Sequence, residues 1–337
     1  MKSAVAATRY MGFDAIAEPI QPHLRALGQY LETQIDAFEP EIQELVRYCI
    51  LNQGKRIRSV LLFFSGFGSL DVVNKEQVRA AAIVELVHLA TLVHDDILDD
   101  ATMRRNRPTA DNKYGSKIAV LLGDALFSHA LKLASEFETT KVCSCVAEAT
   151  RQVCTGEIEQ IFERGNVELS LERYFRLIDL KTARLFEASG WLGAFLSEYP
   201  EGFAAAAAEV GRRLGVAYQM FDDWSDLVSE EEVIGKTLGT DIATGKYTLP
   251  VIVLMQQMDA DERAKWNERA RNRCIAVDEL REAFRRFDVE ASVRATFDSE
   301  LNQAERCLAS YDGLRPVTHL KGLIQVVRSL MDRATLS

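Results

Sequence analysis

Apolar residues recur at helical spacing through most of this chain, and that periodicity limits its fold more than any other feature. Residues three and four apart share one face of an α-helix, so each apolar series predicts a helix with one buried face. Only 7 prolines interrupt the 337 residues, too few breakers for many short strands. We therefore predict an all-α fold built as a single large helical bundle. Two clear series are Leu24, Leu27, Leu31 and Ile35, then Ile83, Leu86, Val87, Ala90 and Val93.

The chain contains no stretch with the composition of a flexible linker and no repeat of about 20–50 residues. We expect one domain over residues 1–337, with residues 1–13 as a frayed N-terminus. The longest apolar tract, Ala80 to Val93, is interrupted by Glu85 and His88 and is shorter than the about 18 apolar residues of a membrane helix. We therefore expect no integral membrane segment.

The formal net charge is −10. A field of this sign opposes general binding to nucleic acid, so any phosphate site must be local. The 6 cysteines include no Cys-x-x-Cys pair and no zinc-finger spacing. Reduced thiols and a cytoplasmic location are therefore expected.

An acidic cluster follows the apolar helix that begins near Ala80. Its sequence, HDDILDD, places Asp95 and Asp99 four residues apart, with Asp96 three residues before Asp99. On a helix these carboxylates share a face and repel one another unless a cation collects them. Hard oxygen ligands of this kind suit magnesium bound to a phosphate.

A second cluster repeats the spacing of the first after another apolar helix. The sequence FDDWSD places Asp222 and Asp226 one turn apart, with Asp223 beside Asp222. One acidic cluster alone is more often a solvated helix end. Two clusters facing each other across a bundle could hold several divalent ions around a diphosphate.

Basic residues occur at separate positions in the sequence and could bind the negative charge of a diphosphate. In the segment GKRIR, Lys55 and Arg58 lie three apart, which predicts that they share one helical face. Arginine offers a planar fork to two phosphate oxygens, while lysine offers a compact charge. The other candidates are Arg104, Arg105, Lys181 with the neighbouring Thr182, Lys236 and Lys246.

At this point the chain resembles the trans-type isoprenyl diphosphate synthases, the polyprenyl synthetase family. The likeness runs from about Gly54 to Pro250. It rests on these motifs in order: GKRIR, ELVHLATLVHDDILDD, MRRNRPT, GDALF, KTARLFEAS, YQMFDDWSD and GKTLGTDIATGKYTLP. The resemblance implies an all-α fold of the isoprenoid synthase type around a central active-site cavity. It also implies head-to-tail condensation of isopentenyl diphosphate with an allylic diphosphate, and a homodimer.

The resemblance also implies roles for individual residues. Three Mg²⁺ ions would be held by Asp95, Asp96, Asp99, Asp222, Asp223 and Asp226. The allylic diphosphate would be contacted by Arg104, Lys181, Thr182, Gln219, Lys236 and Lys246. Isopentenyl diphosphate would be bound by Lys55, Arg58, His88 and Arg105. Of these, the six aspartates, Lys181 and Lys236 are the expected catalytic residues.

Product length should depend on the side chains that line a tunnel below the first aspartate cluster. Ala90 and Thr91 lie five and four residues before Asp95, where short-chain members often carry a bulky aromatic residue, and Val87 lies one turn deeper. Small side chains leave room for a growing chain. The pattern favours a medium- or long-chain polyprenyl synthase, with a farnesyl or geranylgeranyl synthase as the alternative.

Two residues depart from the family's pattern. Ser59 stands where proline often follows GKRIR, and Asn106 stands where glycine often follows the two arginines. Neither change removes a charge, so we expect an active enzyme.

Three other protein classes compete with this interpretation. A di-iron bundle would need a second Glu-x-x-His pattern besides Glu85 and His88, and the sequence has none. A terpene cyclase would not need the cations assigned to isopentenyl diphosphate. A non-catalytic synthase subunit would commonly have damaged aspartate clusters, whereas both clusters are intact here.

Overall fold

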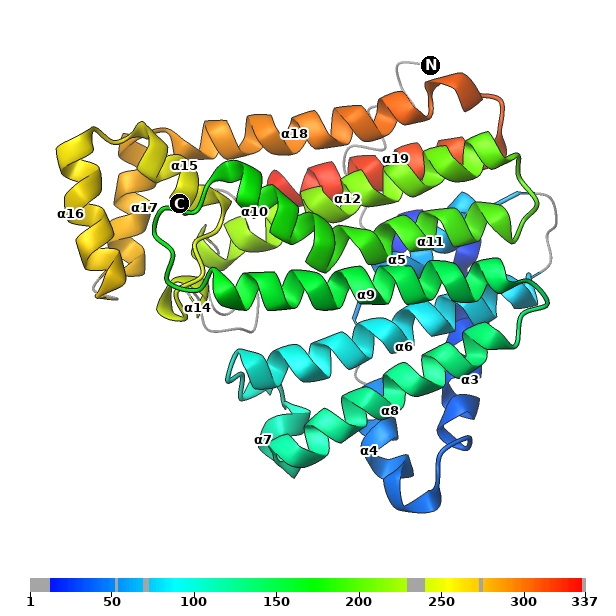
Figure 1. Ribbon diagram of the computed structural model, residues 1–337. Helices are drawn as coiled ribbons and strands as arrows, with labels where there is room; N and C mark the ends of the chain where they lie inside the picture. Colours follow the sequence, from blue (N-terminus) through cyan, green and yellow to red (C-terminus); the bar gives the residue numbers. More distant parts are fainter. Residues whose placement is uncertain (1–12, 52–53, 69–72, 229–239, 273–274, 335–337) are drawn as a thin grey trace.

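The computed structural model describes residues 13–51, 54–68, 73–228, 240–272 and 275–334, and this part of the chain is almost entirely helical. The expected all-α fold is therefore confirmed. Figure 1 shows the long helices running roughly alongside one another across the molecule. The N-terminal half consists of α2 (Phe13–Ile16), η1 (Glu18–Ile20), α3 (Gln21–Ile35), α4 (Pro40–Ile50), α5 (Ile57–Ser65), α6 (Lys75–Leu98), β1 (Met103–Arg104), β2 (Arg107–Pro108), α7 (Ala110–Tyr114), α8 (Ser116–Ser135) and α9 (Thr140–Phe162).

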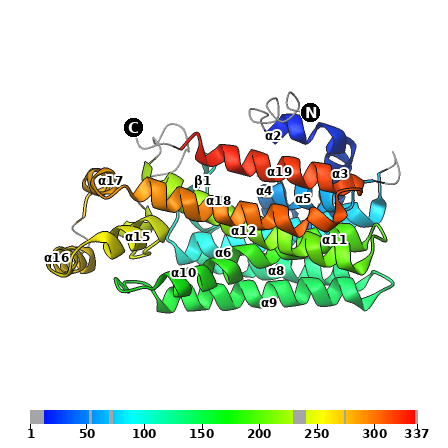
Figure 2. The same cartoon turned by 90° about the horizontal axis from the view of Figure 1, so that it is seen from above.

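The second half carries the remaining helices. Its order is α10 (Leu171–Ile178), η2 (Asp179–Ala183), α11 (Arg184–Phe195), α12 (Glu201–Val228), α14 (Thr240–Ala243), α15 (Leu249–Gln257), α16 (Ala260–Arg271), α17 (Val277–Arg286), α18 (Val289–Cys307), η3 (Ala309–Tyr311) and α19 (Arg315–Met331). Seen from above in Figure 2, α9 and α19 lie on opposite sides of the molecule, with α6 and α12 between them.

Helix α6 lies in the middle of the bundle and contacts α3, α5, α8, α9 and α11. Its first turn is capped by Asn74, whose side chain accepts hydrogen bonds from the backbone N–H groups of Glu76 and Gln77. The run from Ala80 to Val87 is buried on every side, which is the pattern of a helix enclosed by others. The acidic end of α6 is therefore held by the core of the molecule.

Helix α12 is the second long core helix, and it packs against α11 and α18. Its buried residues recur at helical spacing from Phe203 to Met220 and continue through Trp224 to Val228. The indole Nε1 of Trp224 donates a hydrogen bond to the backbone oxygen of Ala334, 2.7 Å away. The second acidic cluster therefore also lies at the end of a helix fixed by packing.

Helix α8 differs from the other core helices because one of its faces is uncovered. It packs against α6, α7 and α9. By length and composition alone it is the one helix of the described residues that could cross a membrane, although 44% of its apolar window is buried inside the bundle. The exposed apolar side chains of this face are Ile118, Val120, Leu121 and Leu131.

Candidate active site

The first aspartate cluster occupies the end of α6. Asp95 and Asp96 belong to the last helical turn, while Asp99 follows the helix as its C-cap. Asp96 is 4% exposed, and its Oδ1 accepts a hydrogen bond of 2.7 Å from Nε of Arg104. Burial raises the pKa of Asp96 even though Arg104 acts in the opposite direction. This carboxylate is thus enclosed and only partly compensated.

Asp99 is paired with two cations from distant parts of the chain. Arg164, which follows α9, donates to Oδ1 at 2.5 Å, and Lys246 donates to Oδ2 at 2.7 Å. Burial would raise the pKa of Asp99, but Lys246, Lys181 and Arg164 together hold it below its ordinary value. Residues far apart in the sequence therefore converge on this carboxylate.

Lys181 approaches the first cluster from a widened turn of helix. Residues 179–183 form the π-helical segment η2 between α10 and α11, and such a turn commonly marks a functional position. Its Nζ lies 2.8 Å from Glu157 Oε2, 2.9 Å from Gln160 Oε1 and 3.6 Å from Asp95 Oδ2. A side chain at Gly156 could not fit here, because its Cβ would lie 2.6 Å from the backbone nitrogen of Lys181.

The second aspartate cluster lies in the last two turns of α12. Asp223 is 5% exposed, and its carboxylate accepts hydrogen bonds from the Tyr174 hydroxyl at 2.5 Å and from Nε2 of Gln219 at 2.8 Å. Thr182 donates in turn to Oε1 of Gln219 at 2.8 Å. Asp222 is exposed and Asp226 is half-buried. The expected partners Thr182 and Gln219 thus lie beside the second cluster.

Asp241, in the short helix α14, connects the two clusters electrostatically. Burial raises the pKa of Asp241; Lys246 opposes this shift, whereas the charges of Asp222 and Asp99 add to it. Contacts agree with this, because Lys181 lies 3.6 Å from Asp95 of the first cluster, while the next residue, Thr182, is bonded through Gln219 to Asp223 of the second. The ends of α6 and α12 face one common region rather than opposite sides of the molecule.

The four residues expected to bind isopentenyl diphosphate are only partly arranged as the sequence predicted. Helix α5 begins at Ile57, and Arg56 before it has φ 49°, in the left-handed region. The expectation that Lys55 and Arg58 share a helical face is therefore wrong: Lys55 precedes the helix and is exposed. The guanidinium of Arg58 lies inside the protein over the ring of Phe186, 4.6 Å from its centroid.

His88 and Arg105 lie close to Arg58. The pKa of His88 lies well below its ordinary value because the ring is desolvated and because Arg58, Arg105 and Arg104 are near it. His88 is therefore neutral at physiological pH and can both donate and accept a hydrogen bond. Arg58, His88, Arg104 and Arg105 thus form one positively charged group beside the first aspartate cluster.

A β-hairpin presents the two consecutive arginines. Strand β1 ends at Arg104 and β2 begins at Arg107, and the two strands pair antiparallel. The central residues Arg105 and Asn106 have φ 52° and 60°, both positive, as in a two-residue turn of type I′. Asparagine tolerates this conformation, so Asn106 can occupy the turn position where glycine is usual.

The residues of α6 that were predicted to line the tunnel lie at buried or half-buried positions of that helix. Val87 and Ala90 are fully buried, and Thr91 is half-buried with its hydroxyl donating to the backbone oxygen of His88 at 2.7 Å. Lys236 lies outside the described residues.

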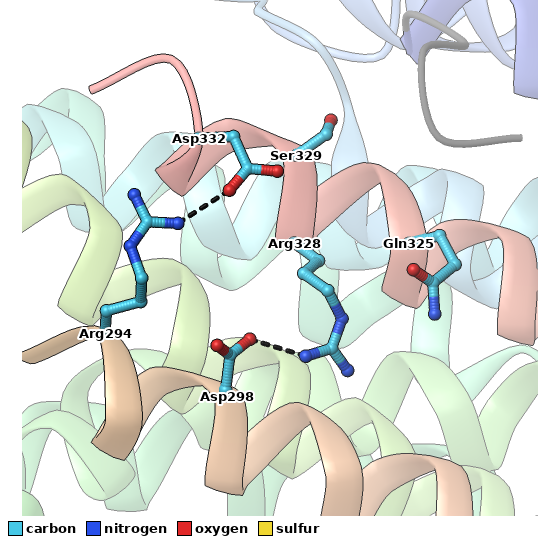
Figure 3. A pocket seen from close by; sticks show the side chains of 6 residues that line it. All are labelled: Arg294, Asp298, Gln325, Arg328, Ser329 and Asp332. Carbon is cyan, nitrogen blue, oxygen red and sulfur yellow. Dashed lines mark hydrogen bonds and ion pairs between the residues drawn. The ribbon is translucent and has the colours of Figure 1, made fainter. Parts of the chain in front are cut away.

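A pocket between α18 and α19 lies away from both aspartate clusters. Figure 3 shows its two ion pairs, Arg294 with Asp332 at 2.6 Å and Arg328 with Asp298 at 2.5 Å. Because its arginines are already matched by carboxylates, this pocket offers little unbalanced charge to a ligand. The acidic end of the bundle remains the candidate site.

The donor atoms of the candidate site fit a hard divalent cation, although no three metal-ligating side chains already converge among the residues that the structure describes. The carboxylates of the first cluster are paired with lysine and arginine instead. Burial raises the pKa of Asp223 to about 8 and that of Glu157 to about 7, so additional positive charge would be favourable here. Oxygen ligands in this number suit magnesium or calcium.

Sequence reasoning missed several residues of this site. Glu157 and Gln160 lie three apart on one face of α9 and both accept from Lys181, and Arg164, four residues further on and just after the helix, donates to Asp99. That spacing is visible in the sequence and could have identified these residues as members of one site. Tyr174 gave no comparable signal, because its partner Asp223 lies 49 residues away in another helix.

Comparisons with known proteins agree with this geometry. The model of the polyprenyl synthetase family matches residues 39–287. The octaprenyl diphosphate synthase of Haemophilus influenzae is 34% identical over 75% of this chain and 77% of that protein. Heptaprenyl diphosphate synthase component 2 of Geobacillus stearothermophilus is 33% identical over 90% of this chain and 96% of that protein. A polyprenyl synthase from Caulobacter crescentus, crystallised with calcium and isoprenyl diphosphate, superposes with TM-score 0.85 and 27% identity over 94% of this chain and 98% of that one. The chain therefore belongs to the polyprenyl synthetase family.

Proposed function

We propose that this prenyltransferase lengthens an allylic diphosphate with isopentenyl diphosphate by magnesium-assisted ionisation at the ends of α6 and α12. The observation that carries the proposal is that two neighbouring residues reach the two clusters: Lys181 Nζ lies 3.6 Å from Asp95 Oδ2, and Thr182 donates to Gln219, which donates to Asp223. Two carboxylate clusters around one region could hold divalent ions that bind a departing diphosphate between them. The region would belong to one domain spanning the chain.

The carboxylates would hold Mg²⁺, with three ions per active site. When bound, the ions would neutralise the charge that develops on the leaving diphosphate. Lys181, Arg104 and Lys246 contact Asp95, Asp96 and Asp99 respectively, so they already stand where the diphosphate would meet the first cluster. Thr182 and Gln219 would line the same group, and Lys236 is expected to join them. The metal ligands would be Asp95, Asp96, Asp99, Asp222, Asp223 and Asp226.

The second substrate would bind beside the first. Arg58 and Arg105 would bind the diphosphate of isopentenyl diphosphate as planar forks, neutral His88 would donate a hydrogen bond, and Lys55 would add charge from the surface. Its alkene would attack the allylic cation, and the proton then lost would pass to the released diphosphate. No protein nucleophile is needed for this reaction.

Medium- or long-chain products are proposed because Ala90, Thr91 and Val87, which precede the first cluster on α6, have small side chains in place of a bulky aromatic one. A short-chain farnesyl or geranylgeranyl synthase is the alternative. The distinction rests on the size of these side chains, and product chromatography decides it.

A homodimer is proposed through the exposed face of α8. The side chains of Ile118, Leu121 and Leu131 form an apolar strip on a water-exposed helix, a pattern typical of interfaces. Leu121→Lys should shift the mass measured by light scattering toward the monomer, whereas Ser299→Lys at an exposed position of α18 should leave it unchanged. The five described cysteines are all free, in keeping with a cytoplasmic location.

The decisive assay combines purified protein, Mg²⁺, labelled isopentenyl diphosphate and allylic primers of five to twenty carbons. We expect incorporation of label into a longer prenyl diphosphate, and loss of incorporation with chelator. The proposal fails if none of the primers is extended.

A further inference from the structure

Glu85 is a buried carboxylate that the proposed reaction does not use. It lies on α6, one turn before His88, and is 4% exposed. An ionised group so deeply buried needs compensation from charge or hydrogen bonds. Its surroundings show where that compensation comes from.

Three arginines from two segments interact electrostatically with Glu85. Burial lowers the pKa values of Arg56, Arg58 and Arg105, and in each case Glu85 acts in the opposite direction. For Arg58 the pKa falls to about 10. The Nε of Arg58 is buried and has no hydrogen-bond partner, so this guanidinium is oriented by charge and by the ring of Phe186. The charge of Glu85 thus opposes the cost of burying these guanidiniums, while its carboxylate directly contacts Ser59, the residue next to Arg58 in α5.

The backbone at Gly54 allows Arg105 to reach this group. A Cβ at Gly54 would lie 2.4 Å from Nη2 of Arg105, so the guanidinium packs directly on the glycine backbone. The turn of the hairpin and the segment before α5 are therefore fitted together. The position of Arg105 depends on both.

Ser59 orients Glu85 through a hydrogen bond. Its hydroxyl donates to Oε1 of Glu85 at 2.5 Å, and the serine is fully buried. Proline, which often occupies this position in the family, could not make that bond because it has no hydroxyl. The serine that replaces proline at position 59 therefore makes a specific hydrogen bond in this chain, to Glu85.

We propose that Glu85, held by Ser59, is a positioning residue that fixes Arg58 and Arg105 for the diphosphate of isopentenyl diphosphate. The inference rests on the proposed function, since it assigns these arginines to that substrate. It adds a carboxylate and a hydroxyl that themselves touch no substrate. Their effect should therefore fall on one substrate and spare the other.

The test compares Glu85→Gln and Ser59→Ala with the wild-type enzyme, with KM measured separately for the two substrates. Glu85→Gln keeps the shape and the acceptor for Ser59 but removes the charge. We expect its KM for isopentenyl diphosphate to rise by about tenfold or more, with the KM for the allylic substrate changed by less than about twofold. Ser59→Ala should give a smaller rise in the KM for isopentenyl diphosphate, again with little change in the KM for the allylic substrate. Ser59→Thr keeps the hydroxyl and should have the wild-type KM values.

Ser65→Ala is the matched control. Ser65 is also a fully buried serine of α5, but its hydroxyl donates to the backbone oxygen of Leu61, away from the arginines. It should leave both KM values unchanged. Equal rises in the two KM values for Glu85→Gln and Ser59→Ala, or no rise for isopentenyl diphosphate, would overturn the positioning role.

Calorimetric titration of isopentenyl diphosphate alone separates this inference from the proposed function. If the wild-type protein binds and extends isopentenyl diphosphate and the variants bind it with the same affinity, only the role of Glu85 is overturned. Wild-type protein that neither binds nor extends it overturns the proposed function itself. If Glu85→Gln fails to fold, Ser59→Ala and Ser59→Thr still decide the question.

Discussion

Replacing Lys181 with methionine should destabilise the protein in the absence of metal and substrate. The side chain of Lys181 is 20% exposed, and its ammonium group lies 2.8 Å from Glu157 Oε2 and 3.6 Å from Asp95 Oδ2. Burial alone would lower the pKa of Lys181, but Asp95 and Glu157 raise it above its ordinary value. Methionine fills similar space and leaves both carboxylates uncompensated.

The size of the loss follows from the burial of this pair. Removing one partner of a buried ion pair costs about 3–5 kcal/mol, because the other charge stays buried. A chain of 337 residues has an unfolding entropy of about 0.7 kcal/mol per kelvin near its Tm. Lys181→Met should therefore lower Tm by about 4–7 °C.

Lys132 supplies the control for this experiment. It pairs with Glu136 at 2.6 Å, but the two side chains are 63% and 43% exposed. An exposed pair is worth at most about 1 kcal/mol, so Lys132→Met should lower Tm by less than about 2 °C. Both variants would be measured by scanning calorimetry in chelator.

A double variant tests the cause of the loss. Lys181→Met combined with Glu157→Gln should recover part of the lost stability, because one of the uncompensated carboxylates is gone. The reasoning is refuted if Lys181→Met melts within 1 °C of the wild-type protein, or if Lys132→Met loses as much.

Three further predictions concern the site. Asp95→Ala and Asp222→Ala should each lower kcat at least about 100-fold in the labelled-substrate assay; near-normal rates would remove that residue from catalysis. Ala90→Phe should shorten the product seen by chromatography, and an unchanged distribution would refute the tunnel assignment. Burial and nearby arginines keep the folded-state pKa of His88 well below 6.5, so folded protein binds fewer protons there than unfolded protein. Stability should therefore fall as pH drops below about 6.5, and fall less in His88→Gln; parallel stability curves would contradict this.

Much of the fold followed from apolar spacing because the core helices obey it. The periodicity around Ile83 and Val87 predicted α6, and burial on every side confirms it. The two acidic motifs also fall where they were expected, at the ends of α6 and α12. Helical spacing is a local property, so the sequence displays it directly.

The features that the sequence did not predict are those fixed by contacts between distant helices of the bundle. Arg56 adopts a left-handed conformation that delays the start of α5, and no spacing pattern reports it. The widened turn that carries Lys181 depends on its packing against Gly156 of α9. The pairing of Asp99 with Arg164 and Lys246 joins segments up to 147 residues apart. Such long-range pairing is fixed only when the helices pack.

The central claim is that the aspartates of α6 and α12 serve one diphosphate. A crystal structure with Mg²⁺ and a non-reactive allylic diphosphate analogue tests it most directly. The account predicts metal ions bound by Asp95 and Asp99 on one side and by Asp222 on the other, with the diphosphate between them. Metal bound at only one of the two helices, with the diphosphate located elsewhere, would contradict it.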